Sequence, residues 1–412
     1  MAFLIPSHAS RPSDDPIFAL NAEARARAKA GESIVNATVG AMMDDDGRLA
    51  VLPSVAQALR EVPAEVGAAY APISGSPAFL RGVIDDLLGG RPEAAQAIAV
   101  ATPGGSGALR LALGNLLEPG QTLLTTSLYW GPYKTLADEA DRKLATFRMF
   151  DEQGRLDVAD FEAKLAGLVE KEGRALVFLN SPCHNPTGYS FDEAEWEAIA
   201  AAVERVADRG RGPVTILLDV AYARYAATDL SHCIDRVIHL AKKALILFAW
   251  SASKSFTEYG LRVGALVAVV PDAEERKQIE SAFSYSCRGT WSNCNAAGMA
   301  AIARILEDAE LRARVDGERA ELKAVLDRRV ARWNELGGKA GLRYPRYDGG
   351  FFTTVFCEDA AGAAAKLRAD GLFVVPQSGA LRVALCSVAE RDIARLVEGI
   401  ARHTRGGPRG GP

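Results

Sequence analysis

Along most of the chain, short apolar runs alternate with longer stretches in which apolar residues recur at helical spacing. Runs of four to eight residues that are apolar almost throughout are typical of strands buried on both faces of a parallel sheet. We therefore predict an α/β fold in which a mostly parallel, seven-stranded sheet lies between helices. The predicted strands are Ala97–Ala101, Thr122–Thr125, Leu144–Phe147, Ala175–Asn180, Val214–Asp219, Ala244–Trp250 and Val263–Val270. The helices predicted between them are Ser106–Leu117, Val158–Leu168, Asp192–Asp208 and Ala273–Phe283.

The pattern changes after Trp291. Residues 295–336 are rich in Ala, Arg and Glu and contain no Pro, which predicts long helical structure leading out of the sheet. Beyond it, three apolar runs and two helical segments predict a small α+β domain. The predicted strands there are Gly350–Cys357, Leu372–Val375 and Leu381–Cys386, and the helices are Asp359–Asp370 and Val388–His403.

The N-terminal region is too short to form a domain. We expect only a helix, Ala19–Ala30, and a loop, Val35–Gly47, both packed on the C-terminal domain. The chain is then divided into an N-terminal arm with part of the small domain (1–48), a large domain (49–310), a small C-terminal domain (311–403) and a flexible tail (404–412). The tail consists of Gly, Pro and Arg apart from one Thr, a composition that does not form a core.

Composition narrows the class of function. Hydrophobic residues make up 49% and charged residues 24% of the 412 residues, as is typical of a soluble globular protein. The formal net charge of −4 gives no general attraction to nucleic acid or anionic membranes. No apolar run approaches the ~20 residues of a membrane helix, and the N-terminus lacks the features of a secretion signal. Six cysteines without a Cys-x-x-Cys pair and five dispersed histidines predict a cytoplasmic protein with reduced thiols and no metal site.

The first candidate for chemistry is the Gly-rich segment 102–107, Thr-Pro-Gly-Gly-Ser-Gly, between a predicted strand and a predicted helix. Glycines let the backbone approach an anion closely, and the free N–H groups at a helix start attract phosphate. The segment lacks the full glycine pattern of a dinucleotide-binding loop and the lysine of a P-loop. Taken alone, it is equally well explained as a helix start after a tight turn.

Three further segments follow the ends of predicted strands. Asn185 lies in His-Asn-Pro-Thr-Gly, and Asp219 ends a buried strand, where a carboxylate needs a cation or several donors. Tyr222 can reach the same pocket. Lys254 ends Ser-Ala-Ser-Lys, and burial of its amine would lower the pKa and make it a nucleophile toward carbonyls. Singly, each segment also has a structural explanation: a rigid loop, a helix cap, a surface lysine. The Ser-x-x-Lys pattern of penicillin-binding enzymes is not supported, because no Ser-Asp-Asn or Lys-Thr-Gly follows.

Taken in order, these motifs resemble those of the fold type I pyridoxal-phosphate enzymes, most closely the aspartate and aromatic amino acid aminotransferases. The resemblance begins at Asp15-Pro-Ile-Phe and extends to the last predicted helix. It implies that Lys254 binds the aldehyde of pyridoxal 5′-phosphate and then acts as a base. It also implies that Asp219 keeps the ring nitrogen protonated and that Tyr222 hydrogen-bonds the ring's 3-oxygen.

The same resemblance implies the remaining contacts. Around the cofactor, they are Trp130 stacking on the ring, Asn185 at the 3-oxygen, Gly105, Ser106, Ser251 and Arg262 holding the phosphate, and Tyr70 reaching the phosphate from the other subunit of a homodimer. Around the substrate, they are Arg382 and Asn185 on the α-carboxylate, Gly40 through its backbone, Phe351 lining the pocket, and Arg288 on a distal carboxylate across the dimer interface.

The resemblance implies an aminotransferase that transfers the amino group of aspartate or an aromatic L-amino acid to a 2-oxo acid such as 2-oxoglutarate, by a ping-pong mechanism. Substrate preference stays open, because Arg288 could instead pair with an interface carboxylate. Tyr133 also replaces a histidine that is common in aspartate-specific members, and Cys294-Asn295 replaces their usual Pro-Pro.

Two other functions are weighed. A β-eliminating or C–S lyase on the same fold remains an alternative, whereas Arg382 argues against α-decarboxylation by holding the carboxylate in the ring plane. An aminotransferase-like sensor domain of a transcription regulator is disfavoured, because no basic DNA-binding segment precedes the arm.

Overall fold

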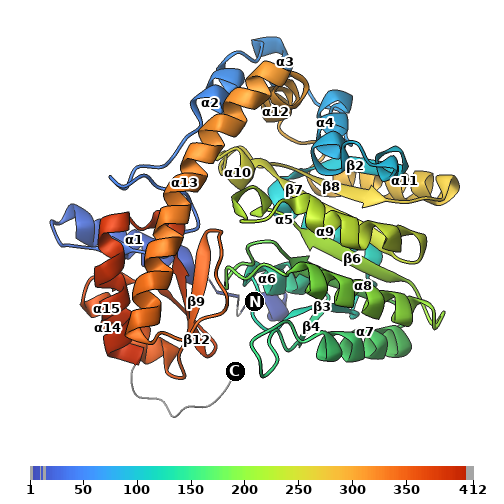
Figure 1. Ribbon diagram of the computed structural model, residues 1–412. Helices are drawn as coiled ribbons and strands as arrows, with labels where there is room; N and C mark the ends of the chain where they lie inside the picture. The colour runs from blue at the N-terminus through green and yellow to red at the C-terminus, as the bar shows by residue number, and fades with distance from the viewer. Residues whose placement is uncertain (1–2, 10, 13–14, 405–412) are drawn as a thin grey trace.

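The computed structural model describes residues 3–9, 11–12 and 15–404, and a seven-stranded sheet lies at its centre (Figure 1). The strands are β2 (Ala97–Pro103), β3 (Thr122–Thr126), β4 (Lys143–Phe147), β5 (Ala175–Asn180), β6 (Val214–Asp219), β7 (Leu245–Ser251) and β8 (Val263–Val269). Their order is β2-β8-β7-β6-β5-β3-β4. Strand β8 is antiparallel to β2 and β7, and the other pairs are parallel. All seven predicted strands are confirmed.

Both faces of this sheet are buried, which explains why its strands are apolar rather than alternating. In β5, Val177 and Leu179 point into one core and Leu176 and Phe178 into the other. The first core is covered by α4 (Pro77–Leu88), α7 (Val158–Glu172), α8 (Glu193–Ala207), α9 (Leu230–Val237) and α12 (Ala296–Glu307). The second is covered by α5 (Gly104–Leu116), α6 (Pro132–Glu139) and α11 (Ala273–Thr290).

A separate core lies beside this sandwich, and the C-terminal residues build most of it. Its strands are β9 (Phe352–Phe356), β11 (Val375–Gln377) and β12 (Ala380–Ala384), which form an antiparallel sheet in the order β11-β12-β9. Its helices are α1 (Pro16–Lys29), α13 (Ala309–Ala340), α14 (Ala360–Ala369) and α15 (Ile393–Thr404). The N-terminal region packs here as expected, because β1 (Val35–Asn36) pairs in parallel with β10 (Leu372–Phe373). The domain limits at 48, 310 and 403 stay predictions.

Three details differ from the sequence-based expectations. The helical stretch 295–336 is interrupted at Asp308, whose carboxylate caps α13 by accepting hydrogen bonds from the backbone of Glu310 and Leu311. The expected loop 35–47 contains the short strand β1. Thr404 belongs to α15, since the helix continues one residue past the expected end, and the rest of the predicted tail lies outside the described residues.

Helix α13 runs from the sandwich to the separate core (Figure 1). It contacts α12 and α2 (Pro53–Arg60) near one end and α15 near the other. The remaining helices are α3 (Ala64–Ala68), α10 (Ala252–Ser255) and the 3-10 turns η1 (Pro6–His8), η2 (Pro92–Gln96), η3 (Ala223–Tyr225), η4 (Ile238–Lys242), η5 (Leu385–Ser387) and η6 (Glu390–Asp392). Within the described part of the chain, no helix combines the length and apolarity needed to cross a bilayer.

Candidate active site

The N-terminus of α5 faces the ends of β7 and β8. Gly104 has a φ of +71°, and a Cβ added there would overlap the guanidinium of Arg262. A Cβ on Gly105 would lie 3.5 Å from the Cβ of Ser251, so both glycines allow a close approach of α5 to these two residues. Ser106 follows in the first turn of α5. The structure therefore places Gly105, Ser251 and Arg262 together, around backbone N–H groups that lack a partner within the helix.

Arg262 is held in place by three oxygen atoms. Its Nη1 donates to Ser253 Oγ at 3.2 Å and to the carbonyl of Tyr259 at 3.0 Å, and its Nη2 donates to the carbonyl of Pro103 at 3.3 Å. A fixed guanidinium beside a helix N-terminus provides a cation and oriented donors, which is the chemistry that binds a phosphate group.

Lys254 lies in the one-turn helix α10, directly after β7. Its Nζ is 4.6 Å from the ring centroid of Tyr259 and 5.9 Å from that of Tyr222. Burial lowers the pKa of this amine from 10.5 to about 8. A substantial fraction is therefore neutral near physiological pH, and the neutral amine is the nucleophilic form.

Asp219 ends β6, the strand next to β7. Its Oδ2 accepts a hydrogen bond of 2.7 Å from the hydroxyl of Tyr133, and its Oδ1 accepts one of 3.3 Å from the backbone of Ala221. Burial nevertheless raises the pKa of Asp219. A carboxylate in this position would be stabilised by a cationic N–H group of a ligand. Trp130 packs edge-on against Tyr133, with ring centroids 5.8 Å apart.

The loop after β5 brings Asn185 to the same place. Its Nδ2 donates to the hydroxyl of Tyr222 at 3.2 Å, and its backbone N–H donates to Asn180 Oδ1 at 2.6 Å. Its Oδ1 is buried without a hydrogen-bond partner among the described residues. A buried amide oxygen without a donor is costly, and a ligand with an N–H or O–H group would satisfy it.

Arg382 reaches this cluster from β12. Its Nη2 donates to the carbonyl of Thr38 at 2.6 Å, while its buried Nε has no partner within the described structure. Its guanidinium carbon is 4.7 Å from the ring centroid of Phe352. Packing against the ring fixes the orientation of the guanidinium plane. The N–H groups in that plane that have no partner can then donate to a carboxylate.

The sequence pointed to Phe351 as the aromatic residue of this pocket, which stays a prediction; the structure places two adjacent rings, those of Phe351 and Phe352, against Tyr222. Phe351 is 0% exposed and packs on Tyr225 and Tyr222, with ring centroids 4.9 and 5.4 Å away. The ring of Phe352 contacts Arg382 and lies so close to Gly40 that a Cβ on that glycine would overlap it. Phe352 begins β9, and neighbouring residues there point in opposite directions.

Comparison with known proteins identifies the family of this chain. The sequence model of the family described as aminotransferase class I and II matches residues 32–400. The chain belongs to this family. It is 29% identical to an aspartate aminotransferase of Pseudomonas aeruginosa, across 80% of this chain and 82% of that protein. It is also 29% identical to a tyrosine aminotransferase of Rhizobium meliloti, across 92% of this chain and 96% of that protein.

Solved structures of aminotransferases share the fold. One from Anaerococcus prevotii superposes with a TM-score of 0.92 at 29% identity, covering 98% of this chain and all of that one. An aromatic-amino-acid aminotransferase from Burkholderia pseudomallei, described as covalently bound to pyridoxal phosphate, gives a TM-score of 0.82 at 24% identity, covering 98% of this chain and 100% of that one. The chain is a pyridoxal-phosphate-dependent aminotransferase with the mostly parallel sheet of fold type I.

The groups assembled in this aminotransferase fit that cofactor. The start of α5, with Ser251 and Arg262, offers an anion-binding cradle, and Lys254 is an amine of lowered pKa. Asp219 is a carboxylate that needs a cation, and Asn185 has a buried oxygen that needs a donor. Phosphate, aldehyde, ring nitrogen and ring hydroxyl are the complementary groups of pyridoxal phosphate.

Two predicted residues of the aminotransferase lie away from this cluster. Tyr70 is 92% exposed, and Arg288 is exposed at the end of α11, where its Nη1 donates to Ser292 Oγ at 2.6 Å. No hydrogen bond or ring contact of the described structure joins either residue to Lys254. Both therefore lie on the surface of the single chain.

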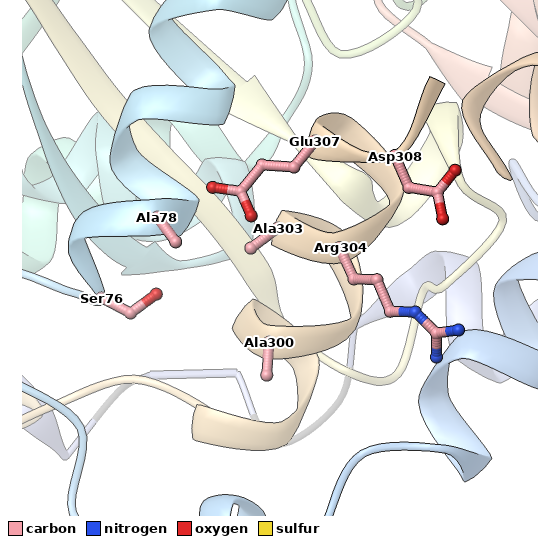
Figure 2. A pocket seen from close by; sticks show the side chains of 7 residues that line it. All are labelled: Ser76, Ala78, Ala300, Ala303, Arg304, Glu307 and Asp308. Carbon is pink, nitrogen blue, oxygen red and sulfur yellow. The ribbon is translucent and has the colours of Figure 1, made fainter. Parts of the chain in front are cut away.

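A hollow of about 460 Å³ near the start of α4 is a separate feature (Figure 2). It is lined by Ser76, Ala78, Ala300, Ala303, Arg304, Glu307 and Asp308. Figure 2 shows the side chains of Arg304 and Glu307 extending in different directions, and Arg304 is paired with Glu61 at 2.5 Å. The hollow contains none of the predicted site residues.

Besides Phe352, sequence reasoning missed two residues of the cluster, Tyr259 and Ser253. Ser253 directly precedes Lys254, and Tyr259 lies between Lys254 and Arg262, the two residues of this segment that the sequence predicted as site residues. Their proximity in the chain was the available signal, but which of these side chains turn inward depends on the path of the segment after α10.

Proposed function

We propose that this enzyme transfers the amino group of aspartate or an aromatic L-amino acid to a 2-oxo acid such as 2-oxoglutarate by a ping-pong mechanism, with Lys254 as the catalytic lysine. The observation that supports it most is the convergence of Lys254, Asp219 and the anion cradle at neighbouring strand ends. Binding sites of open α/β sheets occur at such ends. A cytoplasmic location also stays a prediction.

Each part of the cofactor has a proposed partner in the cluster. When bound, pyridoxal phosphate supplies an aldehyde that binds amines and a ring that withdraws electrons from the neighbouring carbon. The N–H groups of Gly105 and Ser106, the hydroxyls of Ser106 and Ser251, and Arg262 would hold its phosphate. Asp219 would hold a proton on the ring nitrogen, and Trp130 would stack on the ring.

The hydroxyl of Tyr222 would bind the ring's 3-oxygen together with Asn185. The two side chains are already joined by a hydrogen bond of 3.2 Å, so they are oriented as a pair. Lys254 would bind the aldehyde and, once substrate has displaced it, remove a proton from the substrate Cα and deliver it to the cofactor carbon. An amine with a pKa of about 8 exchanges protons readily near neutral pH.

Arg382 would bind the substrate α-carboxylate through the donors that Thr38 does not occupy. Phe352 would keep the guanidinium in one plane, and Gly40, whose missing Cβ leaves room for the Phe352 ring, would approach the substrate through its backbone. A carboxylate held in this way is fixed in space, which positions the Cα–H bond for removal of its proton.

Arg288 and Tyr70 would act in the site of a second copy of the chain, as a homodimer. Their exposure on the single chain supports this assignment, because a side chain that reaches the active site of a neighbouring subunit lies on the surface of its own subunit. An apolar hollow beside Tyr70, lined also by Val66, Met299 and Ala300, offers a surface for that second copy.

The substrate assignment is tested by comparing kcat/KM for aspartate and phenylalanine in the wild type and in Arg288→Ala. If Arg288 pairs with a distal carboxylate, aspartate should lose about 3–5 kcal/mol of transition-state binding, while phenylalanine should lose little. Equal losses for the two substrates would remove Arg288 from substrate recognition and leave it a structural role.

The reaction itself is tested with a panel of amino donors and 2-oxoglutarate. The expected products are a new 2-oxo acid and glutamate, and Lys254→Ala should abolish their formation while the protein stays folded. Ammonia and pyruvate as the products would favour the lyase instead. Unchanged activity in Lys254→Ala would overturn the role of this lysine.

A further inference from the structure

Tyr259 connects three parts of the cluster. Its ring faces the amine of Lys254, with 4.6 Å between Nζ and the ring centroid. Its hydroxyl accepts a hydrogen bond of 2.9 Å from the backbone N–H of Met42, and its carbonyl accepts one of 3.0 Å from Arg262. The ring is thus anchored at its hydroxyl and at its backbone, so its face is presented to the amine in a fixed position.

An aromatic face attracts a cation, because the electrons of the ring form a negative surface. The distance to Tyr259 lies well within the ~6 Å at which this attraction acts, whereas the 5.9 Å to Tyr222 lies at its limit. Among the described residues, Asp219 is the carboxylate that acts on the amine of Lys254, and it does so through its charge without a hydrogen bond. The amine of Lys254 therefore lies over an aromatic ring rather than in an ion pair.

The other charged or titratable groups around Lys254 come from four elements. Burial, the largest influence, lowers the pKa of Lys254; Cys386 in η5 raises it, Arg262 lowers it and Asp219 at the end of β6 raises it, while the ring of Tyr222 faces the amine from the segment after β6. These groups lie around the amine, and the amine itself lies over the face of the Tyr259 ring.

We propose that the ring of Tyr259 positions the free amine of Lys254, holding its protonated form in place whenever the lysine is not bonded to the cofactor. The proposal rests on the proposed role of Lys254. In a transamination the lysine is displaced by the substrate amine and must stay within reach of the carbon whose proton it moves. A flexible four-carbon side chain without an anchor would lose that position.

The ring and the hydroxyl have separable functions. The hydroxyl binds only Met42 in the described contacts, so its removal should affect the loop before α2, whereas removal of the ring should affect Lys254. Tyr259→Phe keeps the ring and deletes the hydroxyl, and Tyr259→Leu deletes both. The phenylalanine variant is thus the matched control for the leucine variant.

The first readout is the pKa of Lys254 in the full-length protein freed of cofactor, measured as the pH dependence of its acetylation rate by peptide mass spectrometry. Because the ring stabilises the cation, Tyr259→Leu should lower this pKa by about 0.5–1.5 units, and Tyr259→Phe should leave it near the wild-type value. Equal values in the leucine variant and the wild type, or the same shift in both variants, would overturn the proposal.

The second readout uses the loaded enzyme. The rate constant of the half-reaction with an amino acid should fall in Tyr259→Leu and be restored in Tyr259→Phe, with KM little changed in both. A fall that appears only in KM would contradict a role on the lysine. Borohydride labelling of Lys254 in the wild type is done first, since its absence would refute the proposed function and not the role of Tyr259.

A third measurement covers the case in which Tyr259→Leu does not fold. Incorporation of phenylalanines with increasing numbers of ring fluorines at position 259 weakens the negative surface of the ring at nearly constant shape. The pKa of Lys254 should fall stepwise along this series. A pKa that is constant along the series would overturn the proposal.

Discussion

At the scale of single residues, the pair Tyr133–Asp219 shows how a buried carboxylate can be kept ready for a cation. Burial raises the pKa of Asp219, and the hydrogen bond from the Tyr133 hydroxyl, at 2.7 Å, acts in the opposite direction by favouring the charged form. Tyr133 is itself buried and neutral, so it supports the charge of Asp219 without bringing a second charge. The carboxylate remains available for the ring nitrogen.

Replacing Tyr133 by Phe removes this donor and should make Asp219 a poorer partner for the cation. A hydrogen bond to a charged group contributes about 1.5–3 kcal/mol, so kcat should fall by about 10- to 100-fold and cofactor affinity should decrease. Both are measured by steady-state kinetics and by cofactor titration.

Tyr189→Phe is the matched control, because the hydroxyl of Tyr189 donates to Glu195 at 2.5 Å in a buried position that contains none of the site residues. This variant should lose some stability but retain its kcat. If both variants reduce kcat equally, the hydrogen bond to Asp219 has no specific role in catalysis.

The site residues that could be identified from the sequence are those that lie at or just after the ends of buried strands. Asp219 and Lys254 follow strands whose limits are clear from their apolar runs, and the structure brings them together. The sequence did not point to Phe352, since its role depends on which of two adjacent phenylalanines lies on the same face of the sheet as Arg382. The position of the Tyr259 ring likewise depends on the path of the turn after α10, and the spacing of apolar residues does not predict that path.

At the scale of elements, the short helix α10 depends on contacts from its neighbours. A helix of four residues leaves its last carbonyls without partners inside the helix. The carbonyl of Ser255 accepts a hydrogen bond of 2.5 Å from Nε of Arg319 on α13. A cation at the C-terminal end of a helix is also favoured by the helix dipole. Helix α13 therefore helps to hold the segment that carries Lys254.

Arg319→Met should remove this support while keeping an apolar side chain of similar length. We expect the free energy of unfolding to fall by about 2–3 kcal/mol and kcat to fall several-fold, because α10 becomes less ordered. Unfolding in urea and steady-state kinetics measure the two effects.

Arg332→Met on the same helix is the control, since the side chain of Arg332 is 42% exposed and pairs only with Glu335 in the described contacts. It should change stability by less than about 0.5 kcal/mol. Similar losses in the two variants would show that α13 does not stabilise α10 through Arg319.

At the scale of the whole molecule, a buried carboxylate joins several distant elements. The side chain of Asp86 on α4 is only 4% exposed and accepts hydrogen bonds from Trp250 on β7 at 2.9 Å and from Arg312 on α13 at 2.5 Å. Arg224 in η3 also pairs with it. Burial opposes the negative charge, but Arg224 and Arg312 outweigh it and hold the pKa of Asp86 below its usual value.

Asp86→Ala would leave two arginines without their anion and should lower the free energy of unfolding by about 3–5 kcal/mol at pH 7. The pKa of Asp86 is lower in the folded than in the unfolded protein. Its contribution is therefore complete above about pH 4 and is lost as the pH falls through the folded pKa. The difference between wild type and Asp86→Ala, measured by urea unfolding from pH 3 to 7, should shrink below pH 4. A difference that stays constant over this range would contradict the paired state of Asp86.

The architecture of the large sheet was predictable, because a strand buried on both faces appears in the sequence as a short run of consecutive apolar residues. The interruption of the helical stretch at Asp308 was not, since its cap depends on one side chain within an otherwise continuous helical pattern. Nor does the sequence of one chain show that Tyr70 and Arg288 lie on the surface.

The central claim is that Lys254 forms the covalent bond to pyridoxal phosphate. The most direct test is reduction of the purified, cofactor-loaded protein with borohydride, followed by digestion and mass spectrometry of the peptides. The account predicts a single phosphopyridoxyl label on the peptide that contains Lys254, and no label on that peptide in Lys254→Ala. A label on another lysine, or an unlabelled protein that retains aminotransferase activity, would contradict it.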